Sequence, residues 1–475
     1  MPTSDHPHLV AIDLGAESCR VSLLQWRGQT PHIELVHRFN NAPVMIGGGL
    51  HWDLSRIISG VEDGLLRCAD KTSAPITAIG LDGWAVDYVR LAETGVPIAQ
   101  PFCYRDLRTQ SIEADLARKC TREELFALCG VQPLRINSLY QLMADSRAGI
   151  PTGIRWANLP EYMLARLGGK IVAEFTNATH TGLLDIQRRT WCPEIFELCG
   201  LDLGAAPELV PTGACLGVVE GRLRDLTPFR ETQLIAPACH DTASAVAGIP
   251  MNGGDWAYIS SGTWSLVGVL IEQPIKSAAA CKAGFTNLGA AGNRLCFHKN
   301  VNGMWLLKQT LNQLCPEDTP WPMAELVAAA EQVDKPEGII DVDDPELWAA
   351  GNLASRINGQ LRRCGLRPIE EHPASMPVFA RLIFHSLAER YATVLADVQR
   401  LTSKKLKMLA VVGGGSLNVF LNRLTADATG LQVCPGIAES STTGNFAVQL
   451  ASLEGCADSP DRIAYWARLL ASGHC

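Results

Sequence analysis

Short apolar runs and helical periodicities alternate along this chain, and the pattern predicts an α/β fold. Strands are expected in the first hundred residues at four apolar runs: Leu9–Ile12, Val21–Trp26, His32–Arg38 and Ile76–Leu81. The first two runs predict a hairpin whose turn carries Asp13, Gly15 and Ser18. Between the third and fourth runs, apolar residues recur at helical spacing after Asp53, which predicts a helix capped by that residue.

The second half of the chain repeats the first half's order of hairpin, helix and strand. The runs Trp256–Ser260 and Trp264–Ile271 predict a second hairpin, joined by the polar turn Ser261–Thr263. The later elements expected are a long amphipathic helix over 383–401, a strand at Met408–Val412, the turn Gly413–Ser416, and a final helix at Phe446–Leu453 after the polar segment Thr442–Asn445. Two related domains are therefore expected, at residues 1–245 and 246–475.

A junction between a strand and a helix near the middle of the chain carries the strongest candidate for chemistry. The apolar run Leu234–Ala236 predicts a buried strand, and the small residues after Thr242 suit a closely packed helix. Asp241 then stands at the N-terminus of that helix, where backbone N–H groups and the helix dipole keep a carboxylate ionised. Two interpretations are open at this point: Asp241 is a base placed between two domains, or it only caps the helix.

Composition narrows the classes of function. The 475 residues are 47% hydrophobic and 19% charged, with a mean hydropathy of +0.08, as in a globular protein with two or three domains. The net charge is −8 and the pI is about 5.8, without a basic cluster, so nucleic acid and membranes are not expected as partners. No stretch reaches the roughly 18 apolar residues that a membrane span requires.

The 16 cysteines indicate a reducing compartment. None forms a C-x-x-C pair, and Cys68, Cys129, Cys199 and Cys239 lie in apolar or helical stretches. Buried thiols are therefore expected, and neither a disulfide framework nor a zinc site is expected. The first residues, MPTSDHPHLVAID, lack the basic and apolar regions of a signal peptide, so a cytoplasmic location is expected.

Three glycine-bearing polar turns follow strands and have the composition of phosphate-binding loops. They are Asp13–Arg20, Ser261–Thr263 and Gly413–Ser416. Glycine lets backbone N–H groups approach an oxyanion, and the Ser18 and Thr263 hydroxyls add donors. Each turn alone is weak evidence, because neither a Walker A motif nor a G-x-G-x-x-G motif follows a strand. A phosphate-rich ligand held from both halves explains why both halves carry such a turn.

Acidic side chains at strand ends offer a place for a metal ion. Asp13 lies within the first of these turns, and carboxylates usually meet bound phosphate through a hard cation. Mg²⁺ is therefore expected there, unless Asp13 only closes an Asx turn. Asp82, Asp87 and Asp106 also follow strands, where such acids are more often caps or turn residues than ligands. Trp84 is expected in the core or in a pocket wall.

Seven segments of the chain match a known family in order. They are DLGAESCR, GLDGWAVDYV, YRDLR, TNAT (Thr176 to Thr179), CHDTASAV, SSGTWSLVG and VVGGGS. Together they resemble the FGGY family of carbohydrate kinases, from about residue 9 to about residue 455. HDTASAV and SSGTWSL resemble the branch of that family that acts on L-rhamnulose or L-fuculose.

This resemblance implies an α/β fold with two actin-like (ribonuclease H-like) domains flanking a central catalytic cleft. It also implies transfer of phosphate from ATP to the 1-hydroxyl of a ketose, with L-rhamnulose favoured by His37–Asn41 and Trp52–Asp53. Asp241 is the implied general base, and Asp13 lies nearest the implied Mg²⁺. The implied sugar contacts are Ala85, His240, Thr242 and Asn300. The implied nucleotide contacts are Ala16, Glu17, Ser18, Cys19, Arg20, Thr263, Lys308 and Gly414.

Five positions depart from the family's pattern. Glu17 and Cys19 stand where relatives carry small or hydroxyl residues, and Lys308 stands where a glutamine is found. Gly83 and Ala85 stand where threonine and glycine are usual, and loss of a hydrogen-bonding group alters sugar discrimination. The alternatives are L-fuculose, xylulose or glycerol as substrate, or an actin-like nucleotide-binding protein without catalysis. A small-molecule sugar and ATP are the expected partners of a monomer or homodimer.

Overall fold

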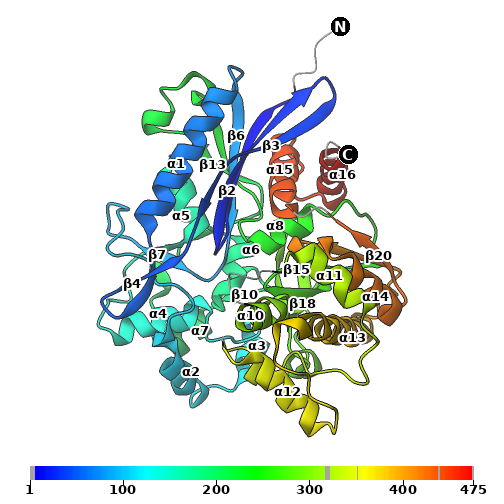
Figure 1. Cartoon of the computed structure of the whole chain (residues 1–475). Coiled ribbons are helices and arrows are strands. Elements are labelled where there is room, and N and C mark those ends of the chain that lie inside the picture. Colours follow the sequence, from blue (N-terminus) through cyan, green and yellow to red (C-terminus); the bar gives the residue numbers. More distant parts are fainter. Residues whose placement is uncertain (1–5, 316–320, 350, 437–438, 473–475) are drawn as a thin grey trace. The chain divides into compact units, whose positions relative to one another are not determined.

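The computed structural model describes residues 6–315, 321–349, 351–436 and 439–472 (Figure 1). They form two compact units. The first unit comprises Met1–Asn252, Leu270–Phe297 and Ser440–Cys475, and the second comprises Gly253–Val269 and His298–Glu439. The expected division into residues 1–245 and 246–475 makes each domain one continuous stretch, whereas the first compact unit also takes in two later segments.

A six-stranded sheet forms the centre of the first unit. Its order is β13 (Ala214–Val218), β14 (Gln233–Ala236), β6 (Ile76–Gly83), β1 (His8–Leu14), β2 (Ser18–Arg27) and β3 (Thr30–Asn40). β1 and β2 pair antiparallel as the predicted hairpin, while β6 runs parallel to both β1 and β14. The strands predicted from the apolar runs are confirmed, and three parallel strands end at one edge of the sheet.

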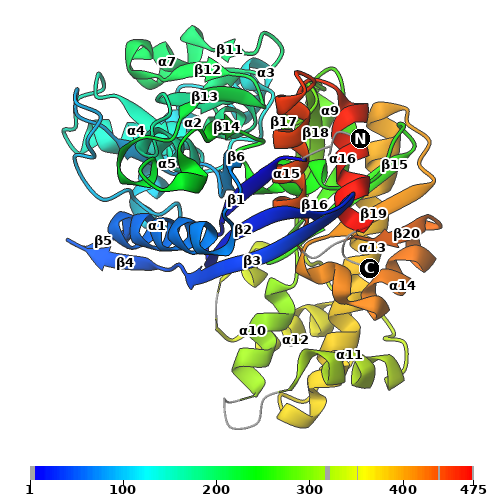
Figure 2. The ribbon, with the colours of Figure 1, turned by 90° about the horizontal axis from the view of Figure 1, so that it is seen from above.

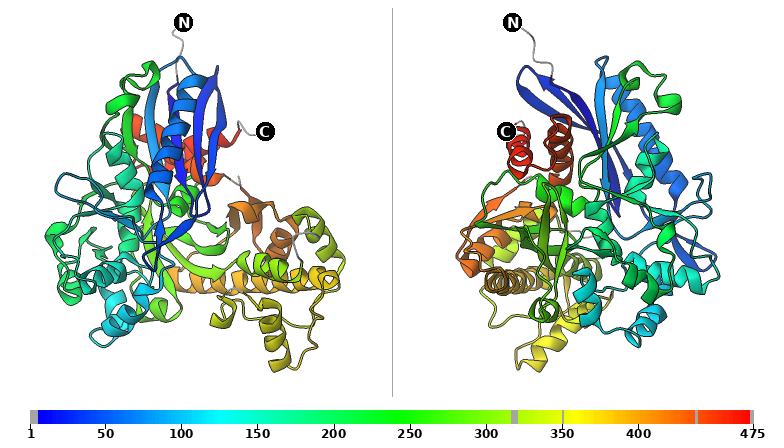
Figure 3. Two further views of the ribbon diagram at one scale, coloured as in Figure 1. Left: turned by 60° about the vertical axis from the view of Figure 1, so that its left-hand side comes forward. Right: turned by 180° about the vertical axis from the view of Figure 1, so that it is seen from behind.

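Helices cover both faces of this sheet. They are α1 (Leu54–Lys71) and α5 (Leu159–Arg166) on one face, and α8 (Asp241–Ala247), α15 (Ser440–Leu453) and α16 (Pro460–Ser472) on the other. Val10 and Ile12 pack on the first layer and Leu9 and Ala11 on the second, because successive strand side chains point to opposite faces. In Figures 2 and 3, α15 and α16 are the red helices beside the blue strands.

Local sequence signals set the ends of helices in this unit. Asp53 caps α1 by accepting a hydrogen bond from the backbone N–H of Arg56 at 3.0 Å, as predicted. The capping box of Thr121 and Glu124 begins α3 (Arg122–Cys129), and Gly130 ends it in the left-handed conformation. The other helices are α2 (Gln110–Ala117), α4 (Ser138–Arg147), α6 (Phe175–Ala178), α7 (Pro193–Cys199) and α9 (Ala278–Lys282).

The N-terminal half also contains four two-stranded sheets among its described residues. They pair β4 (Pro43–Ile46) with β5 (Gly49–Trp52), β7 (Tyr88–Arg90) with β8 (Trp156–Asn158), β9 (Val172–Glu174) with β12 (Glu208–Val210), and β10 (Leu184–Asp185) with β11 (Thr190–Trp191). β7 follows the segment that contains Ala85, and β9 precedes the TNAT segment.

A second six-stranded sheet organises the second half of the chain. Its order is β17 (Phe285–Ala290), β18 (Arg294–Asn302), β16 (Trp264–Ile271), β15 (Trp256–Ser261), β19 (Met408–Val412) and β20 (Gln432–Pro435). β15 and β16 pair antiparallel as the second predicted hairpin, and β15 runs parallel to β19. The helices are α10 (Trp305–Leu314), α11 (Met323–Gln332), α12 (Leu353–Arg363), α13 (Met376–Thr402) and α14 (Val419–Thr429).

Two predictions about local structure are wrong. The final helix was expected at Phe446–Leu453, but it begins at Ser440 and α16 follows it. Residues 440–445 are polar and resemble a turn, yet most of them are buried, and tertiary contacts supply partners for their side chains. Asp13 and Ser18 lie in β1 and β2 and not in the turn, because the ladder of the hairpin extends to the ends of both strands. None of the described helices is both long and apolar enough to cross a membrane.

Candidate active site

Asp241 stands at the start of α8, five residues after β14 ends at Ala236. The predicted placement between strand and helix is confirmed, but the N-cap residue is His240, so the interpretation of Asp241 as only a cap is wrong. Asp241 Oδ1 accepts a hydrogen bond from the Thr242 hydroxyl at 3.1 Å and lies 3.3 Å from His240 Nε2. The side chain remains 36% exposed, so its two chain neighbours hold a carboxyl that is open on one side.

Three acids, Asp13, Asp82 and Asp241, form what we call the acid cluster. β1 and β6 run parallel with Asp13 directly opposite Asp82, and the next residue, Gly83, bridges to His240. The ends of three parallel strands thus bring these acids together, as is common at the carboxyl edge of such a sheet. Asp13 is 4% exposed and Asp82 is fully buried, so their negative charges are poorly screened by water.

Burial and the nearby charge of Asp13 raise the pKa values of Asp241 and Asp82. Loss of hydration raises the pKa of Asp241 to about 7, and the negative charge of Asp13 adds to the rise. Burial also holds the pKa of Asp82 well above its ordinary value, with Asp13 again adding to it. The expectation that the helix N-terminus keeps Asp241 fully ionised at neutral pH is therefore wrong, because loss of hydration and the charge of Asp13 outweigh the dipole; about half of the carboxyls are ionised at pH 7.

Polar residues of α15 complete the acid cluster from within the same unit. Ser441 Oγ donates a hydrogen bond to Asp13 Oδ2 at 2.7 Å, and Asn445 Nδ2 donates one to Asp82 Oδ2 at 2.6 Å. Because they are four residues apart, both side chains lie on one face of the helix. Arg20 Nη1 also contacts Asp13 Oδ2 at 3.1 Å. In the part of the chain that the structure describes, Asp82 Oδ1 has no hydrogen-bond partner.

The predicted sugar-side segment, which contains Ala85, is held in place by Asp87. The fully buried Asp87 carboxylate accepts hydrogen bonds from Trp52 Nε1 (2.5 Å), Trp84 Nε1 (3.0 Å), the backbone N–H of Tyr104 (3.1 Å) and Gln141 Nε2 (3.0 Å). Burial nevertheless raises the pKa of Asp87 to about 6. Between Ala85 and Asp87, Val86 has a φ of 72°, which a β-branched residue rarely adopts. The backbone beside Ala85 is therefore fixed in one unusual conformation.

The first predicted phosphate turn connects β1 to β2. A Cβ atom on Gly15 would lie 2.4 Å from the carbonyl oxygen of Ser18, so the turn has no room for a side chain there. Glu17 is exposed, whereas the Ser18 hydroxyl is buried and has no hydrogen-bond partner within the described residues. Burial raises the pKa of the Cys19 thiol to about 12, which makes it a poor nucleophile.

The two predicted phosphate turns of the second unit pack on each other. A Cβ atom on Gly413 would lie 2.7 Å from the Ser261 carbonyl oxygen, and Gly413 has a φ of +80°. A Cβ atom on Gly415 would lie 2.0 Å from Ser261 Oγ. Only glycine allows this approach, and it leaves Gly414 and Thr263 exposed on neighbouring loops.

Lys308 and Asn300 are the remaining predicted contacts of the second unit, and both are exposed. The backbone N–H of Trp305 donates to the Thr263 carbonyl at 3.2 Å, which joins the start of α10 to the glycine turn. Lys308 therefore lies in the first turn of α10, whose start is hydrogen-bonded to Thr263. Asn300 lies on β18, shortly before the same helix.

The predicted site residues thus gather in two groups. In the first unit they are Asp13, Ala16, Glu17, Ser18, Cys19, Arg20, Ala85, His240, Asp241 and Thr242, and in the second they are Thr263, Asn300, Lys308 and Gly414. The assignment of each to base, sugar, nucleotide or metal stays a prediction.

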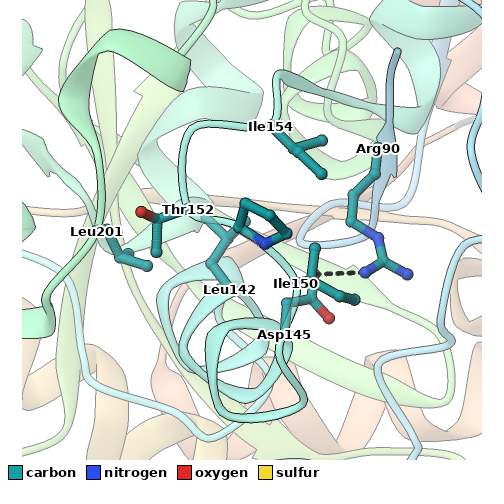
Figure 4. Close-up of a pocket in the computed structure, with 8 residues that line it drawn as sticks. Arg90, Leu142, Asp145, Ile150, Thr152, Ile154 and Leu201 are labelled. Carbon is teal, nitrogen blue, oxygen red and sulfur yellow. Dashed lines mark ion pairs between the residues drawn. The ribbon is translucent and has the colours of Figure 1, made fainter.

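Two hollows in the first unit are lined by other residues. The smaller, beside the ion pair of Arg90 and Asp145 at 3.7 Å, encloses about 20 Å³, which is room for one water molecule (Figure 4). The larger, of about 360 Å³, is lined by Met45, Gly48, Leu50 and residues 105–108. Neither wall includes the acid cluster, so neither hollow is the predicted sugar site.

Sequence reasoning missed three residues, outside the seven matched segments, that contact the acid cluster or His240. They are Ser441, Asn445 and His180, and His180 Nε2 lies 3.0 Å from His240 Nδ1. The available signal for the first two was their spacing of four residues, which is helical, although the final helix was expected to begin only after Asn445. His180 directly follows the TNAT segment, and no local pattern connects it to His240.

Two family models cover most of the chain. The model of the N-terminal domain of the FGGY family of carbohydrate kinases matches residues 8–248, and that of the C-terminal domain matches residues 257–453. The chain belongs to the FGGY family of carbohydrate kinases. This FGGY kinase is accordingly an ATP-dependent sugar phosphotransferase, as the motifs predicted.

Curated relatives align over nearly the full length. A rhamnulokinase of Pectobacterium carotovorum subsp. carotovorum (strain PC1) is 35% identical over 457 residues, which are 95% of this chain and 89% of that protein. A rhamnulokinase of Enterococcus faecalis (strain ATCC 700802 / V583) is 33% identical over 455 residues, covering 95% of this chain and 90% of the relative. The FGGY kinase is therefore similar to rhamnulokinases through both of its halves.

Solved structures confirm the predicted fold. Gluconate kinase from Lactobacillus acidophilus superposes with a TM-score of 0.77 at 15% identity, over 98% of this chain and 97% of that one. Glycerol kinase from Plasmodium falciparum, solved with ADP, gives a TM-score of 0.74 at 16% identity, over 97% and 92%. The two-domain α/β fold of sugar kinases is thus shared despite low identity.

Proposed function

We propose that this FGGY kinase transfers the γ-phosphoryl group of ATP to the 1-hydroxyl of L-rhamnulose. The choice of sugar is supported by the rhamnulokinases that align with 95% of the chain at 33–35% identity. The observation that carries the chemistry is the Asp241 carboxyl, which is partly exposed, held by two neighbours and close to neutral in pKa.

Asp241 is the proposed general base. It accepts the proton of the sugar hydroxyl as the hydroxyl oxygen attacks the phosphorus atom. Phosphoryl transfer has a loose transition state, so orientation of the carboxylate matters more than its base strength. His240 and Thr242, which contact the Asp241 carboxyl, are proposed to orient it and to bind the sugar beside Ala85.

The proposed nucleotide contacts are the turns with crowded glycines. In the first unit, backbone N–H groups of Ala16–Arg20 would bind phosphate oxygens of the nucleotide. In the second unit, the loops at Thr263 and Gly414 are the proposed nucleotide contacts. The buried Ser18 hydroxyl, which has no partner among the described residues, supports this proposal because a phosphate oxygen could accept its hydrogen bond. Lys308 would add a positive charge at the start of α10.

We propose that Mg²⁺ accompanies ATP near Asp13. The acid cluster concentrates negative charge, and the raised pKa values of Asp82 and Asp241 are what a nearby cation would counteract. Among the described residues no group of three or more His, Cys, Asp or Glu side chains is arranged to hold a metal ion. The residues therefore fit an ion held by one or two carboxylates and by phosphate oxygens. When bound, Mg²⁺ would offset the charge of the phosphates.

The proposed setting is the cytoplasm, where ATP is available and thiols stay reduced. Buried unpaired thiols such as Cys68, Cys129 and Cys239 support this setting. The kinase is proposed to act as a monomer or homodimer.

Measurement of ADP release with a panel of sugars tests the proposal. L-rhamnulose is expected to be the fastest substrate among L-rhamnulose, L-fuculose, xylulose and glycerol, and a faster alternative would reassign the substrate. Asp241→Asn is expected to bind both substrates and to lose about 100-fold or more in kcat. Asp53→Asn, which alters the N-cap of α1, is the matched control and should retain kcat. Near-normal turnover by Asp241→Asn would remove Asp241 from this role.

A further inference from the structure

The residues that immediately precede Asp241 are not part of any helix or strand. β14 ends at Ala236 and α8 begins at Asp241, so residues 237–240 lack the regular hydrogen bonds of either element. One contact from the sheet fixes this segment: the backbone N–H of Gly83 donates to the Cys239 carbonyl at 2.9 Å. The backbone N–H groups of Cys239 and His240 need other partners, because buried donors without an acceptor are costly.

Two side chains of the segment that contains the TNAT motif supply these partners. Glu174 Oε2 accepts a hydrogen bond from the Cys239 N–H at 3.0 Å, and Thr176 Oγ1 accepts one from the His240 N–H at 3.2 Å. Both side chains are fully buried. The acceptors for two consecutive N–H groups therefore come from a single short segment more than 60 residues earlier in the chain.

The Thr176 hydroxyl has a defined direction. It donates its hydrogen to Glu174 Oε2 at 2.5 Å, so its oxygen lone pairs face the His240 N–H. Glu174 also accepts hydrogen bonds from the backbone N–H of Thr176 at 3.0 Å and from the Thr212 hydroxyl at 2.5 Å. Several hydrogen bonds thus fix the Glu174 carboxylate. Thr176 is bound to Glu174 and also accepts the His240 N–H, so it fixes the position of His240.

We infer that Thr176 and Glu174 are positioning residues for Asp241. They fix the backbone of Cys239 and His240, and with it the direction in which the Asp241 carboxyl leaves the start of α8. The inference rests on the proposed function of Asp241 as the base. Reactions between bound groups are sensitive to displacements of about 1 Å, which can reduce the rate about 100-fold.

The decisive comparison is between two substitutions at position 176. Thr176→Val keeps the shape of the side chain but removes the acceptor of the His240 N–H. Thr176→Ser keeps the hydroxyl and loses only a methyl group. Thr232→Val is the matched control, because Thr232 is equally buried, lies just before β14 and donates its hydroxyl to the carbonyl of Ile76 at 2.6 Å. That bond is at the opposite end of the sheet from the acid cluster.

We expect Thr176→Val to lower kcat by about 10- to 100-fold with little change in the KM for ATP. Thr176→Ser should stay within about threefold of wild type, and Thr232→Val should reduce the thermal midpoint while keeping kcat. If Thr176→Val does not fold, Thr176→Ala replaces it in the same comparison.

Equal losses of kcat in Thr176→Val and Thr232→Val would overturn the inference, as would a Thr176→Ser variant as slow as Thr176→Val. The Asp241→Asn variant, measured in parallel, distinguishes failure of the proposed base from failure of the positioning role. Full activity of Asp241→Asn overturns the proposed base, whereas an inactive Asp241→Asn together with a normal Thr176→Val overturns only the positioning role.

Discussion

The raised pKa of Asp241 predicts how the sugar kinase responds to acid. The base can accept a proton only when it is ionised, so kcat/KM for the sugar must fall as pH falls through the pKa of the free enzyme. With a pKa of about 7, about half of the Asp241 carboxyls are ionised at pH 7 and about one tenth at pH 6. We therefore expect kcat/KM at pH 6 to be about ten-fold below its plateau above about pH 8.

Removal of a neighbouring charge should move this midpoint. Asp13 is the second cause of the raised pKa after loss of hydration, so Asp13→Asn should shift the midpoint of kcat/KM to lower pH. The plateau should also fall, because Asp13 is the proposed neighbour of the nucleotide and metal. The position of the midpoint, and not the height of the plateau, is therefore the measurement that tests the coupling between the two acids.

The assay follows ADP by direct chromatography at low sugar concentration, so that no coupling enzyme adds its own pH dependence. Rates are compared from about pH 5.5 to about pH 9 at constant ionic strength. A kcat/KM that stays flat between about pH 6 and pH 8, in an enzyme that Asp241→Asn inactivates, would refute the reasoning about the pKa. An unchanged midpoint in Asp13→Asn would refute the electrostatic coupling between Asp13 and Asp241.

The same shift links Asp241 to stability with a defined sign. The folded state binds the Asp241 proton more tightly than the unfolded state, because its pKa rises from 3.8 to about 7 on folding. The contribution of Asp241 to the unfolding free energy therefore decreases as pH rises from 3.8 to about 7. At about pH 8, Asp241→Asn should then unfold at a higher temperature than the wild type, in contrast to most substitutions of buried polar groups.

Two further predictions concern packing and capping. A Cβ atom on Gly444 would lie 1.8 Å from the Ser244 carbonyl oxygen, so Gly444→Ala should push α15 away from α8. This displacement should reduce the unfolding free energy by about 1–3 kcal/mol and lower kcat. Gly359→Ala on α12 is its control and should be neutral or slightly stabilising, since a Cβ there meets only the end of the Arg363 side chain at 3.8 Å. Thr121→Ala removes the capping box of α3 and should cost about 1 kcal/mol in denaturant unfolding while leaving kcat unchanged. An unchanged unfolding free energy in Gly444→Ala, or a reduced kcat in Thr121→Ala, would contradict these expectations.

Local signals in the sequence predicted much of the fold. The apolar runs that became β1, β2, β6, β15, β16 and β19 are bounded by polar turns, and Asp53 caps the helix that was predicted to follow it. In each case the deciding residues are close neighbours in the chain. The placement of Asp241 between a strand and a helix was predictable for the same reason.

Properties that depend on distant residues were not predictable in this way. Ser441 contacts Asp13, which is 428 positions earlier, and no periodicity within either segment indicates that pairing. The pKa of Asp241 likewise depends on Asp13 and on burial, so the helix N-terminus considered alone gave the opposite sign. The start of α15 was misplaced because residues 440–445 are polar by composition and buried only through tertiary contacts.

The chain order of the first unit has a consequence during synthesis. Most of the face of the first sheet that carries Leu9 and Ala11 is covered by α15 and α16, which leave the ribosome after the other segments of the first unit. A nascent polypeptide of which only the N-terminal 252 residues have emerged therefore has this apolar face covered only by α8, and it lacks the Ser441 and Asn445 contacts to the acid cluster. Termination before Ser440 would therefore give a fragment that exposes part of this apolar face and lacks two hydrogen-bond donors to the acid cluster.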